Sequence, residues 1–318
     1  MPNALERLTA SSLSIGVELP LDNDWAPASE TARQRDGRLP GEPDLAHHAE
    51  LARLADRSGY RALWVRDVPL YDPQFGDAAQ VFEAFSYLGY LAGITERILL
   101  GTAAIVLPIR EPLLTLKAAN TLDQLSNGRL LLGVASGDRP VEYPIFRRDF
   151  ENRGANFRTQ VSMLRDGAPH LPSGVTLLPR TRGALPLLVA GLAQQSANWV
   201  GQNMDGWLAY PGTPEDHLRR SALWRGVAGN KPYITFIHLD LLAAPNAPMQ
   251  RHRFGGSVGR NGLVAELHAM REAGVNHVGL HFRRSQRPVK DAMEEIATYV
   301  LPHFQSDEFA PRRVSEVV

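Results

Sequence analysis

The sequence of 318 residues contains no cysteine. It can therefore form no disulfide bond, and it offers no thiolate as a nucleophile or as a metal ligand. It also lacks any run of about 18 apolar residues, the length that a membrane-spanning helix requires. The amino-terminal segment MPNALERLTASS has no apolar stretch of the signal-peptide type. From these absences we expect no contact with a membrane and a cytoplasmic enzyme.

An excess of charge of one sign is also missing, because 34 Lys and Arg residues balance 34 Asp and Glu residues. Binding of nucleic acid or of an anionic membrane usually requires a basic surface, so neither partner is predicted. The sequence contains neither G-x-G-x-x-G nor the Walker pattern, which argues against a Rossmann NAD site and an NTPase. His47 and His48 have no further ligand nearby in the sequence, so no metal site is predicted.

One glycine-rich segment, GGSVGRNG at 255–262, superficially suggests a phosphate-binding loop. It lacks the Gly-Lys-Ser/Thr ending that such loops use to hold a phosphate. We expect a mobile loop that leads into a helix over 263–273. Arg260 in this loop could close over a substrate or remain solvated.

Eight short apolar runs alternate with amphipathic helical segments, which is typical of parallel strands joined by crossover helices. The predicted strands are 14–20, 61–65, 98–108, 128–135, 185–191, 206–211, 233–242 and 277–282. Their number fits a single (β/α)8 barrel domain over residues 1–318, a fold of typically ~250 residues before insertions. The residues in excess of a minimal barrel fall in segments 20–43, 138–184 and 244–262. A doubly wound open sheet is the competing fold.

Several helix boundaries can be predicted from capping residues. Asp44 is placed to cap a helix that Gly59 ends, and Pro112 lies in the first turn of a helix that Gly128 closes. Gly274 ends a further helix in the same way. In a (β/α)8 barrel the loops that follow the strands build the ligand site, so we expect the functional residues there.

The predicted strand ILLGTAAIVLP, residues 98–108, has small residues at its centre. Thr102, Ala103 and Ala104 fill a sheet core poorly, whereas the ends of the run are aliphatic as a strand buried on both faces requires. Either a neighbouring element fills the space, or a flat group that is not protein lies there.

Segment 101–137, GTAAIVLPIREPLLTLKAANTLDQLSNGRLLLGVASG, resembles the luciferase-like monooxygenases, a family of flavin-dependent (β/α)8-barrel enzymes. The resemblance includes the third strand, a helix that starts with proline, the sequence LDQLSNGR, and a fourth strand that ends in small residues. A weaker resemblance extends from about residue 13 to residue 304. It implies a non-prolyl cis peptide in the third strand, at Ala103–Ala104, packed against the flavin ring.

The resemblance also implies where the flavin phosphate is held, after the fifth predicted strand. Backbone amides and a hydroxyl bind it there in the family, and free N–H groups at a helix start favour anions. The corresponding residues here are Gly191, Leu192, Ala193, Gln194 and Ser196. Ser196 alone reads as a helix N-cap. A site for one phosphate favours FMN over FAD.

Ala135, Ser136 and Gly137, at the end of the fourth strand, should lie beside the ribityl chain of the cofactor. Some relatives have a cysteine and an arginine at the first two of these positions. A cationic phosphate contact is therefore missing here or comes from elsewhere, and Arg139 or Tyr143 is a candidate substitute, although each could equally be an ordinary loop residue.

Candidate acid–base residues lie near the ends of four predicted strands. Arg66 and Asp67 follow the second strand, and Glu18 lies in the apolar first strand, where a carboxylate requires a partner. His238 lies in the seventh strand and could face the barrel mouth. Asp240 and His281 are similarly placed, although a core histidine with satisfied hydrogen bonds is the commoner outcome. Bacterial luciferase has a histidine just past the residue that corresponds to Asp67, whereas this chain has Val68, so the luciferase reaction itself is not expected.

Together these features predict an FMN-dependent monooxygenase that uses reduced flavin, supplied by a separate flavin reductase, and oxygen on a small organic substrate. A deazaflavin-dependent hydride-transfer enzyme and a non-catalytic flavin-binding protein are the alternatives within the family. A sugar-phosphate isomerase with Glu18 or Asp67 as its base is the alternative outside it. Loop 20–43, with Asn23, Asp24 and Trp25, is expected to contribute to the substrate pocket, and the resemblance implies a homodimer.

Overall fold

Eight parallel strands form a closed barrel in the computed structural model, which describes residues 2–24, 26–39, 42–72, 74–75, 82–167 and 171–304. In barrel order they are β1 (Ser14–Glu18), β2 (Ala62–Val65), β3 (Leu99–Thr102), β5 (Leu130–Ala135), β6 (Leu187–Ala190), β7 (Gly206–Leu208), β8 (Tyr233–Leu241) and β11 (His277–His281). β11 pairs with both β8 and β1, and this closes the barrel. The predicted (β/α)8 fold is confirmed, and the open sheet is excluded.

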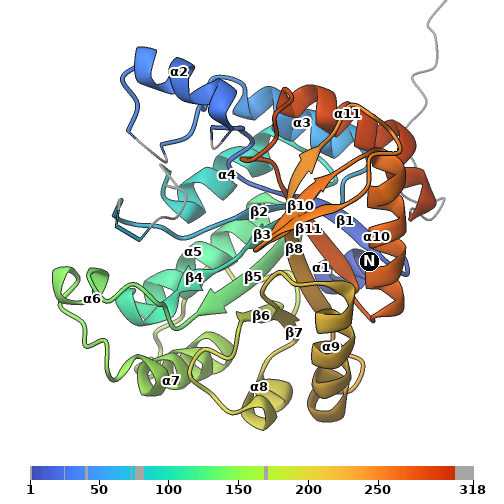
Figure 1. Ribbon diagram of the computed structural model, residues 1–318. Coiled ribbons are helices and arrows are strands. Elements are labelled where there is room, and N and C mark those ends of the chain that lie inside the picture. The colour runs from blue at the N-terminus through green and yellow to red at the C-terminus, as the bar shows by residue number, and fades with distance from the viewer. Residues whose placement is uncertain are drawn as a thin grey trace, which may run out of the picture.

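Helices cover the outside of the barrel (Figure 1). The main ones are α3 (His48–Ser58), α4 (Ala84–Ile94), α5 (Pro112–Leu125), α7 (Arg153–Asp166), α8 (Ala197–Asn203), α9 (Pro214–Ala228), α10 (Arg260–Glu272) and α11 (Val289–Tyr299). Their apolar faces and the outward side chains of the strands form the larger hydrophobic core, in which Val17, Leu132 and Leu239 are fully buried. Burial on both faces explains why the strands read as continuous apolar runs.

The barrel interior is a smaller, separate core. Trp64 and Phe236 pack edge to face inside it, with ring centroids 5.7 Å apart. Glycine on adjacent strands makes room for both rings, because a Cβ at Gly101 would lie 2.3 Å from Trp64 and one at Gly279 would lie 2.4 Å from Phe236. The two rings therefore close the barrel below its carboxyl end.

Short elements complete the chain. They are α1 (Ala4–Leu8), α2 (Pro27–Arg35), β4 (Ile105–Val106), α6 (Glu142–Ile145), the 3-10 turns η1 (Leu107–Ile109) and η3 (Leu301–His303), and the strands β9 (Gln250–His252) and β10 (Gly255–Val258). β4 continues the line of β3 and pairs with β5. Among the described residues, every helix is too short or too polar to span a bilayer.

The predicted helix ends are confirmed where glycine adopts positive φ, at Gly59 (90°), Gly128 (73°) and Gly274 (87°). Pro112 begins α5 as predicted. The N-cap prediction for Asp44 is wrong, because α3 starts three residues later than this capping requires and Asp44 instead accepts a hydrogen bond from the Ala46 amide, at 2.9 Å.

The expected mobile loop at 255–262 is also wrong. Residues Gly255–Val258 form β10, which pairs in parallel with the outer half of β8, and β9 pairs antiparallel with β10. Arg260 begins α10, donates a hydrogen bond to Glu295 at 3.0 Å and lies over the Tyr299 ring. These contacts hold Arg260 against α11, so it does not close over the barrel mouth.

The insertion after β1 carries α2 and is fastened to the loop that follows β11. The Asn23 amide donates hydrogen bonds to the carbonyls of Ser285 and Arg287, both at 3.2 Å. Arg283, which is fully buried, pairs with Asp22 at 2.7 Å. Trp25 lies outside the described residues.

Candidate active site at the carboxyl ends of the strands

One half of the barrel mouth is lined by small side chains. Ala103, Ala135 and Ala190 lie at the ends of β3, β5 and β6, and all three are partly exposed and pack on the inner core. Alternation along a strand places them on the same inward face as Leu131 and Leu188 below them. The result is a shelf of methyl groups above the inner core.

The Ala103–Ala104 peptide is cis, as the sequence analysis expects. Thr102 is fully buried and its hydroxyl donates to the Gly133 carbonyl at 2.7 Å, so its side chain ties β3 to β5. A Cβ at Gly133 would lie 1.9 Å from the Thr102 carbonyl oxygen, and this close approach requires glycine. Of the three small residues in this strand, Ala103 is the one that is partly exposed at the shelf.

The other half of the mouth carries ionisable side chains. Glu18 ends β1 at 2% exposure and accepts a hydrogen bond from Arg66, which follows β2. His238 and His281 are register partners on β8 and β11, and their rings stack with centroids 4.3 Å apart. Burial, followed by the nearby His238 and Arg66, holds the pKa of His281 well below its ordinary value, so this imidazole is neutral. The structure thus brings the predicted Glu18, Arg66 and His238 to one side of the mouth.

Asp67 lies apart from these groups. Its carboxylate accepts hydrogen bonds from Arg110, at 2.6 and 2.9 Å, and from the Val106 amide, at 3.0 Å. Both oxygens are therefore engaged in anchoring the β3–β4 segment. These contacts favour a positioning role, and a catalytic role for Asp67 stays a prediction.

The segment after β5 is packed against its own loop. The Tyr143 hydroxyl donates to the Ser136 carbonyl, and a Cβ at Gly137 would lie 2.7 Å from that hydroxyl. Arg139 donates to the Leu70 carbonyl and lies 4.5 Å from the Phe75 ring centroid. These described contacts of Arg139 and Tyr143 are with the β2 loop and the β5 loop, so their suggested role at the phosphate stays a prediction.

The turn after β6 has the geometry of an anion-binding loop. Gly191, Ala193 and Gln194 have φ values of 57°, 46° and 61°, and turn residues in such conformations can direct amides into a common concavity. The Gly191 amide donates to the Leu208 carbonyl at 3.0 Å, so the predicted anion contact falls to the amides of residues 192–194. Ser196 follows as the N-cap of α8, accepting from the Trp199 amide at 3.2 Å, so the N-cap interpretation is confirmed. Leu192 is 42% exposed.

Arg158 of α7 contacts this turn, and Arg153 precedes Gly154, where a Cβ would lie 2.8 Å from the Gln194 Cβ. Neither arginine was predicted from the sequence. The side-chain oxygen Oε1 of Gln195 accepts from Arg158 at 2.9 and 3.0 Å, and its side-chain Nε2 donates to the Gly154 carbonyl at 2.7 Å. Arg153, beside Gly154, stacks on Phe150, and its buried Nε has no hydrogen-bond partner among the described residues. The missed signal is the FENRGANFR segment, whose arginines are spaced along the first turns of a helix.

Two buried carboxyl groups were also missed. Burial raises the pKa of Glu142, which is 2% exposed at the start of α6, to about 7, and Asp67 and Asp138 act in the same direction against Arg139. Burial likewise raises the pKa of Asp22 to about 6, although Arg283 opposes the shift. Neither burial nor these long-range neighbours can be read from the local sequence.

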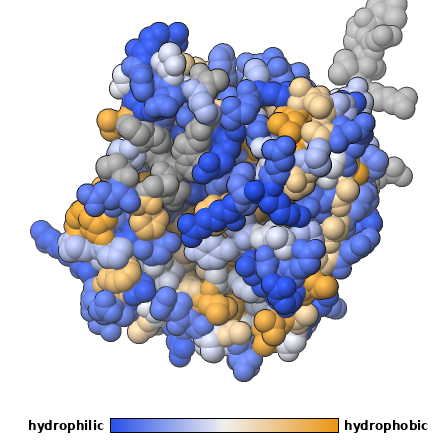
Figure 2. All heavy atoms as spheres, in the orientation of Figure 1, coloured by the Kyte–Doolittle hydropathy of each residue, from blue (hydrophilic) through white to orange (hydrophobic). Residues whose placement is uncertain are grey.

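The described residues form no group of three or more potential metal ligands. Their arrangement does fit a flat phosphorylated cofactor: a shelf without bulky side chains lies beside a turn with oriented amides, and a buried guanidinium nitrogen near that turn lacks a partner. The face in Figure 2 is mostly hydrophilic, with hydrophobic side chains in small separate groups.

Comparison with known proteins gives the family. The model of the luciferase-like monooxygenases matches residues 28–228. The chain belongs to this family. The alkanal monooxygenase alpha chain of Photorhabdus luminescens is 26% identical over 166 residues, which cover 48% of this chain and 44% of that protein. The F420-dependent glucose-6-phosphate dehydrogenase of Beutenbergia cavernae is 28% identical over 205 residues, which cover 59% of this chain and 60% of that protein.

This luciferase-like chain thus spans about half the length of the curated relatives it matches. Among solved structures, the monooxygenase RslO1 from Streptomyces bottropensis superposes with a TM-score of 0.70 at 20% identity, over 91% of this chain and 99% of that one. At this identity the likeness shows the fold alone. The curated relatives thus include an F420-dependent enzyme, and the solved structures that share the fold include a monooxygenase in complex with FMN and an F420-dependent alcohol dehydrogenase.

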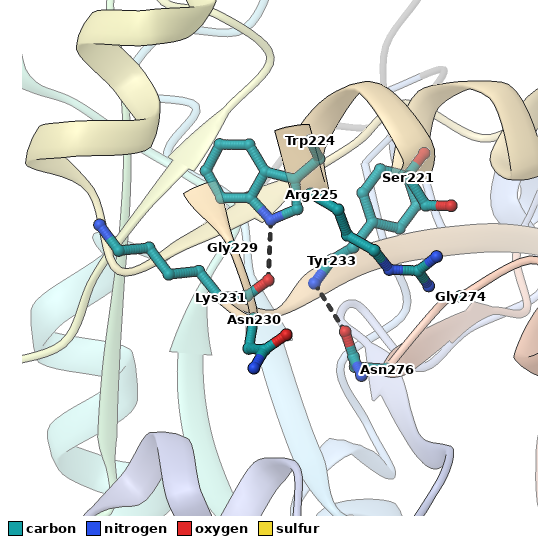
Figure 3. A pocket seen from close by; sticks show the side chains of 9 residues that line it. All are labelled: Ser221, Trp224, Arg225, Gly229, Asn230, Lys231, Tyr233, Gly274 and Asn276. Atoms are coloured by element: carbon teal, nitrogen blue, oxygen red, sulfur yellow. Dashed lines mark hydrogen bonds between the residues drawn. The ribbon is translucent and has the colours of Figure 1, made fainter. Parts of the chain in front are cut away.

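A second feature of the structure lies at the opposite end of the barrel. A cavity of about 200 Å³ at the amino ends of β8 and β11 is lined by Trp224, Arg225, Lys231, Tyr233 and Asn276, among others (Figure 3). Its walls are held by hydrogen bonds from Trp224 to the Lys231 carbonyl (2.8 Å) and from the Tyr233 amide to Asn276 (2.9 Å). In (β/α)8 barrels this end serves stability rather than catalysis, so we do not place the active site here.

Proposed function

We propose that the protein is an FMN-dependent monooxygenase that acts on a small organic substrate at the barrel mouth. The observation that carries the proposal is the division of the mouth into a shelf of three alanines and a cluster of buried ionisable groups. The first half suits a planar ring, and the second suits proton transfer to a substrate. In this reaction one atom of O2 enters the substrate and the other leaves as water, with reduced FMN from a separate reductase as the electron donor.

The cofactor would be held by two parts of the chain. The ring would lie on Ala103, Ala135 and Ala190, and bulkier side chains there would collide with it. The phosphate would meet the amides of the turn at 192–194, the Ser196 hydroxyl and the positive charge of Arg153. Bound FMN would supply the redox chemistry, and the protein would supply orientation and electrostatics.

The ionisable half of the mouth would handle the substrate. His281 is neutral and fully buried, so it packs against the ring of His238 without adding charge. The Glu18–Arg66 pair neutralises itself at the rim. Burial of Glu18, His238 and His281 excludes bulk water from the place where a proton would move.

A binding titration tests the proposal. Purified protein is titrated with oxidised and photoreduced FMN while flavin fluorescence is followed, first as wild type and then as Ala103→Leu. We expect the substitution to weaken binding at least about tenfold, since a buried collision of this kind costs about 1–3 kcal/mol. Ala222→Leu, on the exposed face of α9, is the matched control. Absence of binding to either form of FMN by the wild-type protein would refute the FMN proposal.

A deazaflavin-dependent hydride transfer is the second candidate function. It is favoured by the similarity of the chain to the F420-dependent glucose-6-phosphate dehydrogenase of Beutenbergia cavernae. The two candidates differ in oxygen use, because only the monooxygenase consumes O2 with its substrate. Binding without any turnover would indicate a non-catalytic flavin-binding protein. The homodimer and the reductase partner stay predictions.

A further inference from the structure

The cavity at the amino ends of β8 and β11 has no part in the function proposed above. It lies between the last turns of α9 and the two short connections that lead into these strands, residues 229–232 and 273–276. The polar side chains in its lining include Ser221, Arg225, Asn230, Lys231 and Asn276 (Figure 3). None of the lining residues that the structure describes is acidic, so the cavity has an excess of positive charge.

Arg225 supplies the positive charge at the cavity wall. The residue is exposed, and no carboxylate lies within ion-pair distance of it in the described part of the chain. Its guanidinium lies against the backbone before β11, because a Cβ at Gly274 would be 1.7 Å from Nη2. Glycine at this position therefore leaves the space that the guanidinium occupies. Lys231 is the second cation, but its Nζ donates to the Gly201 carbonyl at 2.6 Å and its side chain extends away from Arg225 (Figure 3).

Asn276 is fixed with its amide nitrogen available to a ligand. Its Oδ1 accepts from the Tyr233 amide at 2.9 Å, and its backbone amide donates to the Tyr233 carbonyl at 2.8 Å. These bonds direct the side-chain oxygen toward β8, so Nδ2 is the end of the amide that can donate elsewhere (Figure 3). Asn230, on the neighbouring connection, is exposed and adds a second side-chain amide to the lining.

The carboxyl ends of α9 and α10 meet at this cavity, and their partial negative charge would by itself oppose an anion. Carbonyl groups at the end of α10 are, however, already hydrogen-bonded within the protein. The Val275 amide donates to the Met270 carbonyl at 3.0 Å, and the Ser221 hydroxyl donates to the Ala273 carbonyl. Because these carbonyls are occupied and the described lining contains no carboxylate, the guanidinium of Arg225 decides which ligands the cavity favours.

We propose that this cavity binds a small organic molecule with a phosphate or carboxylate group, at a site separate from the active site. Arg225 would donate two parallel hydrogen bonds to the oxyanion, for which a planar guanidinium is well suited, and Asn276 would donate a third from Nδ2. A cavity of about 150 Å³ can hold benzene, so the volume of about 200 Å³ leaves room for an organic group beside Trp224. The inference does not depend on which cofactor the barrel mouth binds.

Two probes that share a ring and differ in their oxyanion test the proposal. The full chain is titrated with phenyl phosphate and with benzoate by isothermal titration calorimetry. We expect binding of at least one probe, weakened by high salt because Arg225 is exposed. Tighter binding of phenyl phosphate would identify phosphate as the preferred group, and tighter binding of benzoate would identify a carboxylate.

Matched variants locate the binding. Arg225→Gln should fold normally and should weaken binding about tenfold or more, the effect of losing one charge-assisted hydrogen bond. Asn276→Asp keeps the acceptor for the Tyr233 amide but replaces the Nδ2 donor by a negative charge, so it should weaken binding at least as much. Arg219→Gln is the control, because Arg219 lies on the same helix, outside the cavity, and pairs with Asp216.

The same variants separate this site from the cofactor site. Phenyl phosphate bound at the turn after β6 would be retained in both cavity variants, and both should keep the wild-type affinity for FMN. Binding of neither probe, or an affinity that neither Arg225→Gln nor Asn276→Asp changes, would overturn this inference and leave the proposed function intact. Binding of a probe that depends on Arg225, together with no binding of FMN, would refute the FMN proposal alone.

Discussion

The two ends of the barrel interior use the same strands in opposite ways. At the amino end, Ser14 bonds to the Leu8 carbonyl of α1 and to His277, both at 2.7 Å, and His277 accepts from Trp64 at 2.9 Å. At the carboxyl end, the inward positions carry alanines on β3, β5 and β6 and the groups Glu18, Arg66, His238 and His281 on the other side.

The difference shows that the amino end of the barrel interior stabilises the fold, whereas the carboxyl end leaves space for a ligand. The amino end has large side chains and internal hydrogen bonds, and a helix plugs it. The carboxyl end has small side chains on one side and buried ionisable groups on the other, and neither feature by itself stabilises the folded state. Sequence–structure conflicts of this kind are expected at functional sites.

The largest effect is expected from Trp64→Ala. The ring is fully buried between Phe236 and His277, so its removal leaves a cavity in the inner core and takes a hydrogen-bond donor from His277. We expect the free energy of unfolding to fall by about 4 kcal/mol. Urea unfolding followed by circular dichroism measures it. A loss below about 1 kcal/mol would show that the inner core is not what stabilises the barrel.

A smaller but still substantial effect is expected from Arg110→Met. It leaves the Asp67 carboxylate buried without its cation, which costs about 3 kcal/mol of unfolding free energy. The double variant with Asp67→Leu should recover much of this loss. Arg165→Met is the control, because Arg165 and Asp205 are about one-third exposed and their pair contributes less than about 1 kcal/mol. Equal losses in both single variants would contradict the buried-pair account.

This pair also shows what the sequence could and could not reveal. The strands, the Pro112 and glycine boundaries and the Ser196 cap follow from local patterns, and the family resemblance located the cis peptide. The partner of Asp67 lies 43 residues away, and that of Asp22 lies 261 residues away. Such pairs depend on barrel closure, which brings residues together without any local signal.

The prediction of a mobile loop at 255–262, where the structure has a hairpin at 250–258, was wrong for a related reason. Glycines at 255, 256 and 259 indicated a loop, yet a Cβ at Gly255 would lie 2.0 Å from the His238 carbonyl oxygen. Glycine is needed there because β10 approaches β8 closely, and not because the segment is free. The stacking of His238 on His281 depends likewise on the β8–β11 register, which no pattern in either strand specifies.

The pH dependence of stability should have opposite signs at the two ends. Glu142, at the carboxyl end, has its pKa raised from 4.5 to about 7. Its contribution to the stability of the folded protein is therefore full below pH 4.5 and is lost as the pH rises to 7. His277, at the amino end, has its pKa lowered from 6.5 to about 3, so its contribution is full above pH 6.5 and is lost as the pH falls.

Glu142→Gln isolates the first of these. The free energy of unfolding of the variant should exceed that of the wild type by up to about 3 kcal/mol at pH 8, and the two should be equal at pH 4. Thermal or urea unfolding at several pH values measures the difference. A constant difference across this range would mean that the Glu142 carboxyl does not titrate differently in the folded and unfolded protein.

The smallest effect, and the most specific, is expected from Ser196→Ala. Loss of the N-cap hydrogen bond to Trp199 should lower the unfolding free energy by about 1 kcal/mol. If the hydroxyl also meets the cofactor phosphate, the affinity for FMN should fall while that for riboflavin, which lacks the phosphate, stays unchanged. Thr213→Ala removes an equivalent cap from α9 and should lower stability by a similar amount without changing FMN affinity. If both variants leave FMN binding intact, Ser196 serves the helix alone, and the amides of the turn and Arg153 must carry the phosphate.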